Sequence, residues 1–296
     1  MIVLENLLLR VFPLASSRSS KWHWTWILCR DSGAVVGGFI LVVVVIAGIV
    51  GPYLTGWDVL KVDPANRLLP PSSSHWLGTD GFGRDVLTRT LFAARISLFV
   101  GMATMVGSTV LGTVVGLVAG YFRAVDGPVM RVMDGFMAFP SILLAIAIMA
   151  SLGPRTENVI VALTIVYLPR IARLVRGQVL VVRQLLYVEA ARVLGADDWR
   201  IVIRHTLPNC LSPLIVQGSF TFAFAVISEA SLSYLGAGVP PELPTWGGML
   251  HEGVPVMGAA WWMSVFPGVA IAITVLSLNQ LGDGLRDALD PRIQRL

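Results

Sequence analysis

The stretch from Ile96 to Phe122, ISLFVGMATMVGSTVLGTVVGLVAGYF, contains no charged side chain. A helix needs about 20 mostly apolar residues to cross the hydrocarbon core of a bilayer, at a rise of about 1.5 Å per residue. This stretch therefore predicts a membrane-spanning helix. Within it, Gly112, Gly116 and Gly120 recur every four residues. This spacing places them on one helix face and predicts that another helix approaches closely there.

The composition of the whole chain points to the same environment. Of its 296 residues, 55% are hydrophobic and 14% are charged, whereas soluble domains carry about 25% charged residues. A soluble fold of this size could not hide so much apolar surface, which excludes a soluble enzyme, a secreted disulfide scaffold and a disordered tail. The two cysteines form no disulfide framework, and a net charge of +4 is too dilute for nucleic acid. Membrane lipid is the expected surrounding, and no nucleic-acid partner is expected.

Further windows without charged residues predict more spans. They are Gly33–Trp57, Gly135–Pro154, Thr206–Ser228 and Gly253–Gly282, with a short and least secure window at Asn158–Pro169. The short window can span if the arginines that follow it lie at the interface with their stems along the helix. Connecting segments on one side hold 16 Lys and Arg against six on the other, which predicts cytoplasmic termini. The expected fold is an all-α integral membrane protein of six transmembrane helices.

These windows divide the chain into five parts. They are a cytoplasmic or interfacial segment, 1–32; a first transmembrane helix, 33–54; an extracytoplasmic loop, 55–95; a core of five transmembrane helices, 96–282, with a cytoplasmic loop at 176–209; and a cytoplasmic tail, 283–296. The tryptophan-rich stretch 21–26 predicts a helix at the inner membrane surface.

Motifs for catalysis or nucleotide binding are missing from the sequence. The only lysines, Lys21 and Lys61, do not complete a Gly-x-x-x-x-Gly-Lys-[Ser/Thr] loop, so the chain does not bind ATP by that route. His251-Glu252 begins like a zinc-protease motif, but Pro255 replaces the second ligand. No catalytic, cofactor or metal residue is expected. Glu229, near the end of the fifth span, is interpreted either as a helix-packing group or as part of an ion pathway.

The segment between the fourth and fifth spans carries the clearest pattern, YVEAARVLGADDWRIVIRHTLPN at 187–209. Good helix formers lead to Gly195, a predicted helix stop. Asp197 or Asp198 then offers an N-cap for a second short helix, which Pro208 is predicted to end. Such a helix pair, with apolar and charged faces, must fold back on the bundle or dock on a partner.

This segment resembles the EAA loop of ABC-importer permeases. Glu189-Ala190-Ala191 is followed by Gly195 six residues after the glutamate, and then by a hydrophobic stretch to Leu207-Pro208. Other stretches resemble the C-type permease of peptide and nickel importers. They are HWLGTD at 75–80, GRDVL at 83–87, RISL at 95–98, Met130-Arg131-x-x-Asp134 with Phe139-Pro140, EASLSYLG at 229–236 and NQLGDGLRDALDPR at 279–292.

The resemblance implies a non-catalytic permease subunit of an ATP-driven importer in the bacterial plasma (inner) membrane. It implies four kinds of contact: a second homologous permease, two ATPase subunits that bind ATP and Mg, an extracytoplasmic substrate-binding protein, and lipid. It also implies that the loop couples ATPase motion to alternating access. The residues assigned to this coupling are Glu189, Ala190, Ala191, Gly195, Ala196, Asp197, Trp199, Ile201, His205, Leu207 and Pro208.

The resemblance favours di- and oligopeptides as substrates, with nickel or another small solute as alternatives. It names no residue of the substrate pathway. An ion-coupled secondary transporter is a further alternative, which would show inverted repeats and intramembrane ion ligands. The sequence shows neither pattern.

Overall fold

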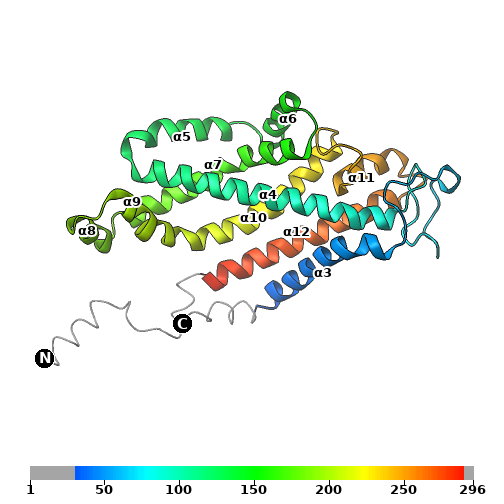
Figure 1. Ribbon diagram of the computed structural model, residues 1–296, viewed down its shortest axis with the longest axis horizontal. Helices are drawn as coiled ribbons and strands as arrows, with labels where there is room; N and C mark the ends of the chain where they lie inside the picture. The colour runs from blue at the N-terminus through cyan, green and yellow to red at the C-terminus, as the bar shows by residue number, and fades with distance from the viewer. Residues whose placement is uncertain (1–30, 290–296) are drawn as a thin grey trace.

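A computed structural model describes residues 31–289 as a bundle of helices (Figure 1). Its helices are α3 (Ser32–Leu54), α4 (Val86–Tyr121), α5 (Arg123–Met137), α6 (Ser141–Leu152), α7 (Thr156–Val182), α8 (Leu186–Val193), α9 (Asp198–Arg200), α10 (Leu207–Tyr234), α11 (Trp246–Gly253) and α12 (Trp262–Leu289). Three single turns are η2 (Pro64–Asn66), the π-turn η3 (Ile201–Thr206) and η4 (Val254–Val256). Within 31–289, β pairing is limited to one bridge between Thr79 and Asp85.

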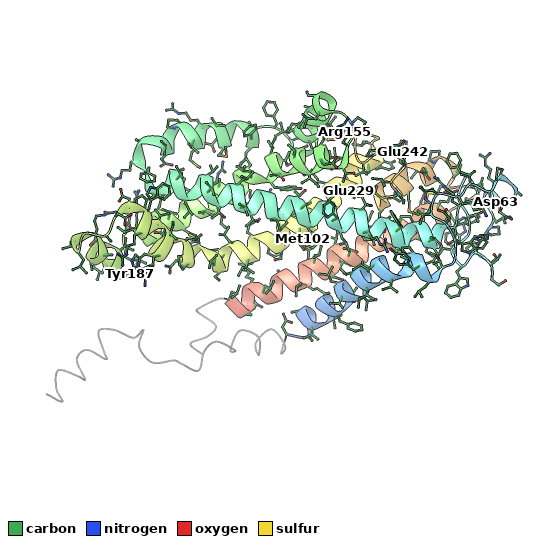
Figure 2. All side chains as sticks on the ribbon, viewed as in Figure 1. Asp63, Met102, Arg155, Tyr187, Glu229 and Glu242 are labelled. Carbon is green, nitrogen blue, oxygen red and sulfur yellow. The ribbon has the colours of Figure 1, made fainter. Side chains whose placement is uncertain are left out.

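Among residues 31–289, five helices are long and apolar enough to cross a membrane: α3, α4, α7, α12 and the continuous helical segment Asp198–Tyr234. The pair α5 and α6 makes a sixth if it counts as one bent span. The predicted all-α fold is confirmed. The two ends of the bundle are named here by their short helices, the α8 end and the α11 end. Figure 2 shows Tyr187 at the first end, Asp63 at the second and Glu229 between them. Which end faces the cytoplasm stays a prediction.

The third and fourth predicted spans differ from expectation. The window Gly135–Pro154 is not one straight helix, because α5 and α6 meet at a bend of 94°. Pro140 precedes α6; its ring removes a backbone donor and disfavours a helical conformation at Phe139. The window predicted to be short, Asn158–Pro169, lies inside α7, a continuous helix of 27 residues. The least regular span is therefore the third, not the fourth.

Several predicted boundaries also move. α4 begins at Val86, so the last ten residues of the predicted loop 55–95 are helical. The window Gly253–Gly282 starts too early, since α11 ends at Gly253 and α12 begins at Trp262. α12 continues to Leu289, so the start of the predicted tail 283–296 is helical. The predicted surface helix at 21–26 lies outside the described residues.

The glycine stripe of α4 is the contact surface for α7, as predicted. An added Cβ at Gly112 would lie 2.6 Å from Cβ of Ile171, and one at Gly116 would lie 2.5 Å from the carbonyl oxygen of Ala172. Gly120 faces Val179 in the same way, at 2.7 Å. The two helix backbones can approach this closely only because the stripe has no side chains.

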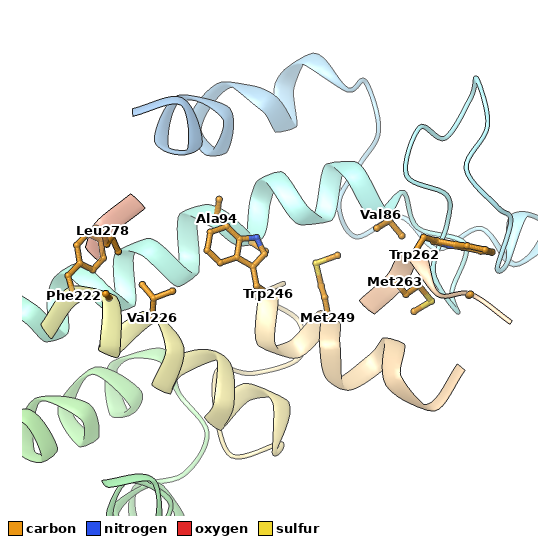
Figure 3. Close-up of a cluster of buried hydrophobic side chains, with 12 residues drawn as sticks. Val86, Ala94, Phe222, Val226, Trp246, Met249, Trp262, Met263 and Leu278 are labelled. Atoms are coloured by element: carbon orange, nitrogen blue, oxygen red, sulfur yellow. The ribbon is translucent and has the colours of Figure 1, made fainter. Parts of the chain in front are cut away.

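A cluster of buried aromatic, sulfur-containing and aliphatic side chains holds the α11 end together (Figure 3). The indole N–H of Trp246 donates to the carbonyl of Thr90 over 3.0 Å, and that of Trp262 donates to the carbonyl of Thr79 over 3.0 Å. Both indoles therefore bury their rings without leaving a polar donor unpaired. The cluster joins α4, α10, α11 and α12.

Glu229 is fully buried and links α10 to α4. Its carboxylate accepts hydrogen bonds of 2.8 Å from the hydroxyls of Ser97 on α4 and Ser233 on α10. The Ser97 oxygen in turn accepts from the backbone N–H of Trp246 over 3.4 Å. A buried carboxylate needs such donors, and these bonds are what the helix-packing interpretation of Glu229 expects.

The turn before α4 is built around the carboxylate of Asp80. It accepts backbone N–H bonds from Phe82 and Arg84, of 2.8 and 2.9 Å, and pairs with the Arg84 side chain at 2.6 Å and with Arg89. Burial acts to raise the pKa of Asp80, but the two guanidinium groups and the N–H donors outweigh it and hold the pKa below its usual value. Arg89 also pairs with Glu252 of α11 at 2.8 Å. No local sequence pattern predicts that these two residues meet.

Candidate functional site

The segment between α7 and α10 forms two short helices with a sharp turn between them at the α8 end (Figure 1). α8 is followed by Gly195, whose φ of +82° is a left-handed conformation that favours glycine. The N–H of Ala196 donates to the carbonyl of Ala191 over 3.0 Å and so satisfies one of the last carbonyls of the helix. An added Cβ at Gly195 would meet nothing within 4 Å, so conformation and not space requires the glycine. The predicted helix stop is confirmed.

The base of this segment is anchored to the bundle by buried apolar side chains. Val188 of α8 and Ile201 of η3 are both 0% exposed and pack with Val182 from the end of α7. The Tyr121 hydroxyl, at the end of α4, donates to the carboxylate of Asp198 over 2.6 Å. Cross-links from two spanning helices therefore fix the segment, which is not a slack linker.

The second short helix does not end at Pro208, contrary to expectation. Helical structure continues from α9 through the π-turn η3 into α10, so that Asp198–Tyr234 forms one segment. Pro208 lies in the first turn of α10, where a missing backbone donor costs least. In the wider π-turn just before it, the N–H of Leu207 donates to the carbonyl of Val202, five residues earlier. Asp197 holds the N-cap position of α9, but its side chain makes no capping bond.

Several apolar side chains on α8 and directly after it are exposed. Val193 is 88% exposed, Leu194 86% and Leu186 82%. Trp199 and Ile203, on the continuation toward α10, are also exposed. Because each apolar group left in water is unfavourable, an apolar cluster of this kind is a candidate docking surface.

The structure sorts the predicted coupling residues by exposure. Glu189, Ala190, Gly195, Asp197, Trp199 and Pro208 are exposed; Ala191, Ala196, His205 and Leu207 are partly buried; Ile201 is buried. Ile201 therefore belongs to the base and not to the outer face. The exposed side chains of Leu186, Val193 and Leu194 were missed. The sequence could have identified them, because they are apolar residues on or next to a short helix that buries Val188.

These observations define a multi-pass helical membrane protein with a firmly anchored apolar helix at one end of its bundle. Residues 108–295 match the family described as "binding-protein-dependent transport system inner membrane component", and residues 20–71 match the N-terminal transmembrane domain of oligopeptide transport permease C. The chain belongs to this family of inner membrane transport components. The resemblance seen in the sequence is thereby confirmed, as is a multi-pass inner-membrane location.

Relatives cover most of the chain. A Brucella abortus protein whose name describes a peptide transport system permease is 47% identical over 267 residues, 90% of each chain. The dipeptide transport system permease protein of Alkalihalophilus pseudofirmus is 44% identical over 268 residues, 90% of this chain and 88% of its own. The glutathione transport system permease protein of Pectobacterium atrosepticum is 42% identical over 292 residues, 97% of each.

Proposed function

We propose that this chain is one of two permease subunits of an ATP-driven importer of di- or oligopeptides. The names of its relatives, which include peptide, dipeptide and glutathione permeases, support this substrate class. The family description supports work with a substrate-binding protein. In this proposal the partners are a homologous permease, two ATPase subunits that hold ATP and Mg, and that binding protein.

We further propose that the α8 segment couples the ATPases to the membrane part. The observation that carries this role is the combination of an open apolar face with a fixed base. Val193 and Leu194 are available to enter a groove of an ATPase subunit, while Val188 and Ile201 hold the segment to the bundle. A surface that was either loose or buried could not transmit a movement. The α8 end would then face the cytoplasm, in line with its many arginines.

The proposed docking is tested by placing a charge on the open face. Leu194→Asp should reduce retention of the ATPase subunits on the purified permease pair at least about tenfold, because a buried apolar anchor is replaced by a carboxylate that stays hydrated. Leu60→Asp is the matched control, since Leu60 is 59% exposed but lies at the α11 end. The measurement is subunit stoichiometry and ATP hydrolysis of the complex in lipid nanodiscs, without binding protein.

Two outcomes would contradict the coupling role. Leu194→Asp could retain the ATPases and their hydrolysis rate at the wild-type level, or Leu60→Asp could lose them equally. Peptide import is tested separately, by uptake of a peptide mixture into proteoliposomes that hold the complete transporter.

A further inference from the structure

Three arginines follow one another along α7 at intervals of three residues, and two of them have an acidic partner. Arg173 pairs with Asp134 of α5 at 2.6 Å, and Arg176 pairs with Asp126 of α5 through contacts of 2.5 and 2.7 Å. Within residues 31–289, Arg170 forms neither an ion pair nor a hydrogen bond, and its guanidinium lies 5.8 Å from the centre of the Phe224 ring. Phe224 offers the cation an aromatic face but no counter-charge.

The unpaired arginine is also the one furthest from the α8 end. It stands 14 residues after Thr156, the start of α7, which is about 21 Å along the helix. The hydrocarbon core is about 30 Å thick, and charged groups within it are rare unless they are paired or face a water-filled space. Arg170 is therefore the arginine of α7 that most needs an anionic partner from outside this chain.

A hollow of about 100 Å³ adjoins Arg170 at the break between α5 and α6. Tyr167 and Arg170 line it from α7, Ser141 from the start of α6, and Phe139 from the break. Irregular backbone at membrane depth is tolerated where it is buried in protein or lines a polar cavity. A broken helix with a cation facing its gap is such an arrangement, and broken helices form substrate sites in other transporters.

The groups that line the hollow favour an anion. The residues that line it include no carboxylate. The first turn of α6, a helix of 12 residues, has no side-chain cap, and its free N–H groups add partial positive charge beside Arg170. The Tyr167 hydroxyl is already engaged with Ser228 at 2.7 Å and with the carbonyl of Phe224 at 3.2 Å. Arg170 is thus the free strong donor of the site.

We infer that Arg170 binds the C-terminal carboxylate of the peptide during its passage. The guanidinium matches a carboxylate in shape and can form two parallel hydrogen bonds with it. The hollow has room for the carboxylate and the atoms next to it but not for a whole peptide, so the remainder of the peptide lies outside it. This inference rests on the proposed import function.

The test combines a change in the protein with a change in the ligand. A mixture of unmodified tripeptides is first offered to proteoliposomes with the complete transporter, and mass spectrometry identifies the peptide taken up best. That peptide and its C-terminal amide are then titrated against the permease–ATPase complex in nanodiscs without binding protein. The variants are Arg170→Gln and Arg170→Lys, with Arg173→Gln as the matched control.

Loss of a charge-assisted hydrogen bond predicts that Arg170→Gln weakens binding of the free acid about 10- to 100-fold. Amidation should weaken binding to the wild type by a similar factor and leave Arg170→Gln almost unaffected, because both changes remove the same contact. Arg170→Lys should recover part of the affinity, and Arg173→Gln should match the wild type.

Other outcomes separate the two proposals. No ATP-driven uptake of any peptide would refute the import function itself. If peptides are taken up but Arg170→Gln and amidation weaken binding additively, only the carboxylate site is overturned. A lipid phosphate or a group of the partner permease would then be the counter-ion of Arg170. Uptake with no detectable binding to the nanodisc complex would overturn it as well, since the site requires the permease to hold the peptide.

Discussion

The glycine stripe between α4 and α7 gives a quantitative prediction for Gly116→Ala. The added methyl group would lie 2.5 Å from the carbonyl oxygen of Ala172, whereas ordinary van der Waals contacts begin at 3.4 Å. The helices must therefore separate locally by about 0.9 Å, the difference between these distances. Overpacking of this kind costs about 1–3 kcal/mol, and the better helix propensity of alanine returns up to about 1 kcal/mol. The net loss therefore lies between about 0 and 3 kcal/mol, with an expected value of about 1–2 kcal/mol.

Gly177→Ala is the matched control for this substitution. Gly177 lies in the interior of α7, but an added Cβ there would meet nothing within 4 Å. Only the propensity effect remains, so this variant should be neutral or slightly more stable. The double variant Gly112→Ala with Gly116→Ala should lose less than the sum of the single losses, because one separation of the helices makes room for both methyl groups.

The assay is reversible unfolding of the purified chain in mixed micelles, with increasing denaturing detergent. Stability is compared among wild type, Gly116→Ala, Gly177→Ala and the double variant. If Gly116→Ala unfolds at the wild-type midpoint, or if Gly177→Ala is equally destabilised, then close backbone packing of α4 on α7 is not what the stripe provides.

Two further predictions concern the ends of the bundle. Because its ion pairs lower the pKa of Asp80, the folded state favours the ionised carboxylate. The stabilisation that results is complete at a pH above 3.8, the ordinary pKa of the group, and it is lost as the pH falls through the lowered pKa of the folded state. Thermal unfolding from pH 6 to 2 should show a smaller acid-side decrease for Asp80→Asn than for wild type or Asp58→Asn, and equal slopes would contradict this reasoning. At the other end, Gly195→Ala should destabilise the α8 segment by about 1–2 kcal/mol through its positive φ alone, whereas Gly195→Asn should cost less. Amide hydrogen exchange of the α8 segment measures the destabilisation in each variant. Equal protection from exchange in Gly195→Ala and Gly195→Asn would exclude a left-handed conformation at Gly195.

Hydropathy located the spans because the bilayer imposes both length and composition on a helix. It placed several ends wrongly because a charged side chain ends an apolar window even where the helix continues through it. Arg95, which donates to the carbonyl of Gly48 on α3 over 2.6 Å, closed the window in α4, and Arg170 closed the window in α7. A local window does not show how either guanidinium is accommodated in the fold, so α4 was expected to start too late and α7 to end too early.

Local backbone signals were informative at one position and misleading at another. Gly195 predicted the helix stop correctly, because a positive φ is a property of the residue and its neighbours. Pro208 was expected to end a helix, yet a proline is equally suited to a first helical turn. Which of these two roles Pro208 takes depends on the π-turn before it, in which Ile201 and Val202 are buried. Similarly, Pro140 could have predicted the break between α5 and α6, but it lies inside a window without charged residues that was read as one span.

The continuity of Asp198–Tyr234 has a mechanical consequence. These 37 residues form a rod about 55 Å long, with Trp199 near one end and Glu229 near the other. Tilting such a rod by about 10° about its Trp199 end sweeps the opposite end sideways by about 9 Å. Glu229 is bonded there to Ser97 of α4. A modest rotation at one membrane surface can thus become a displacement as wide as a helix at the other, and α4 would be drawn along with it.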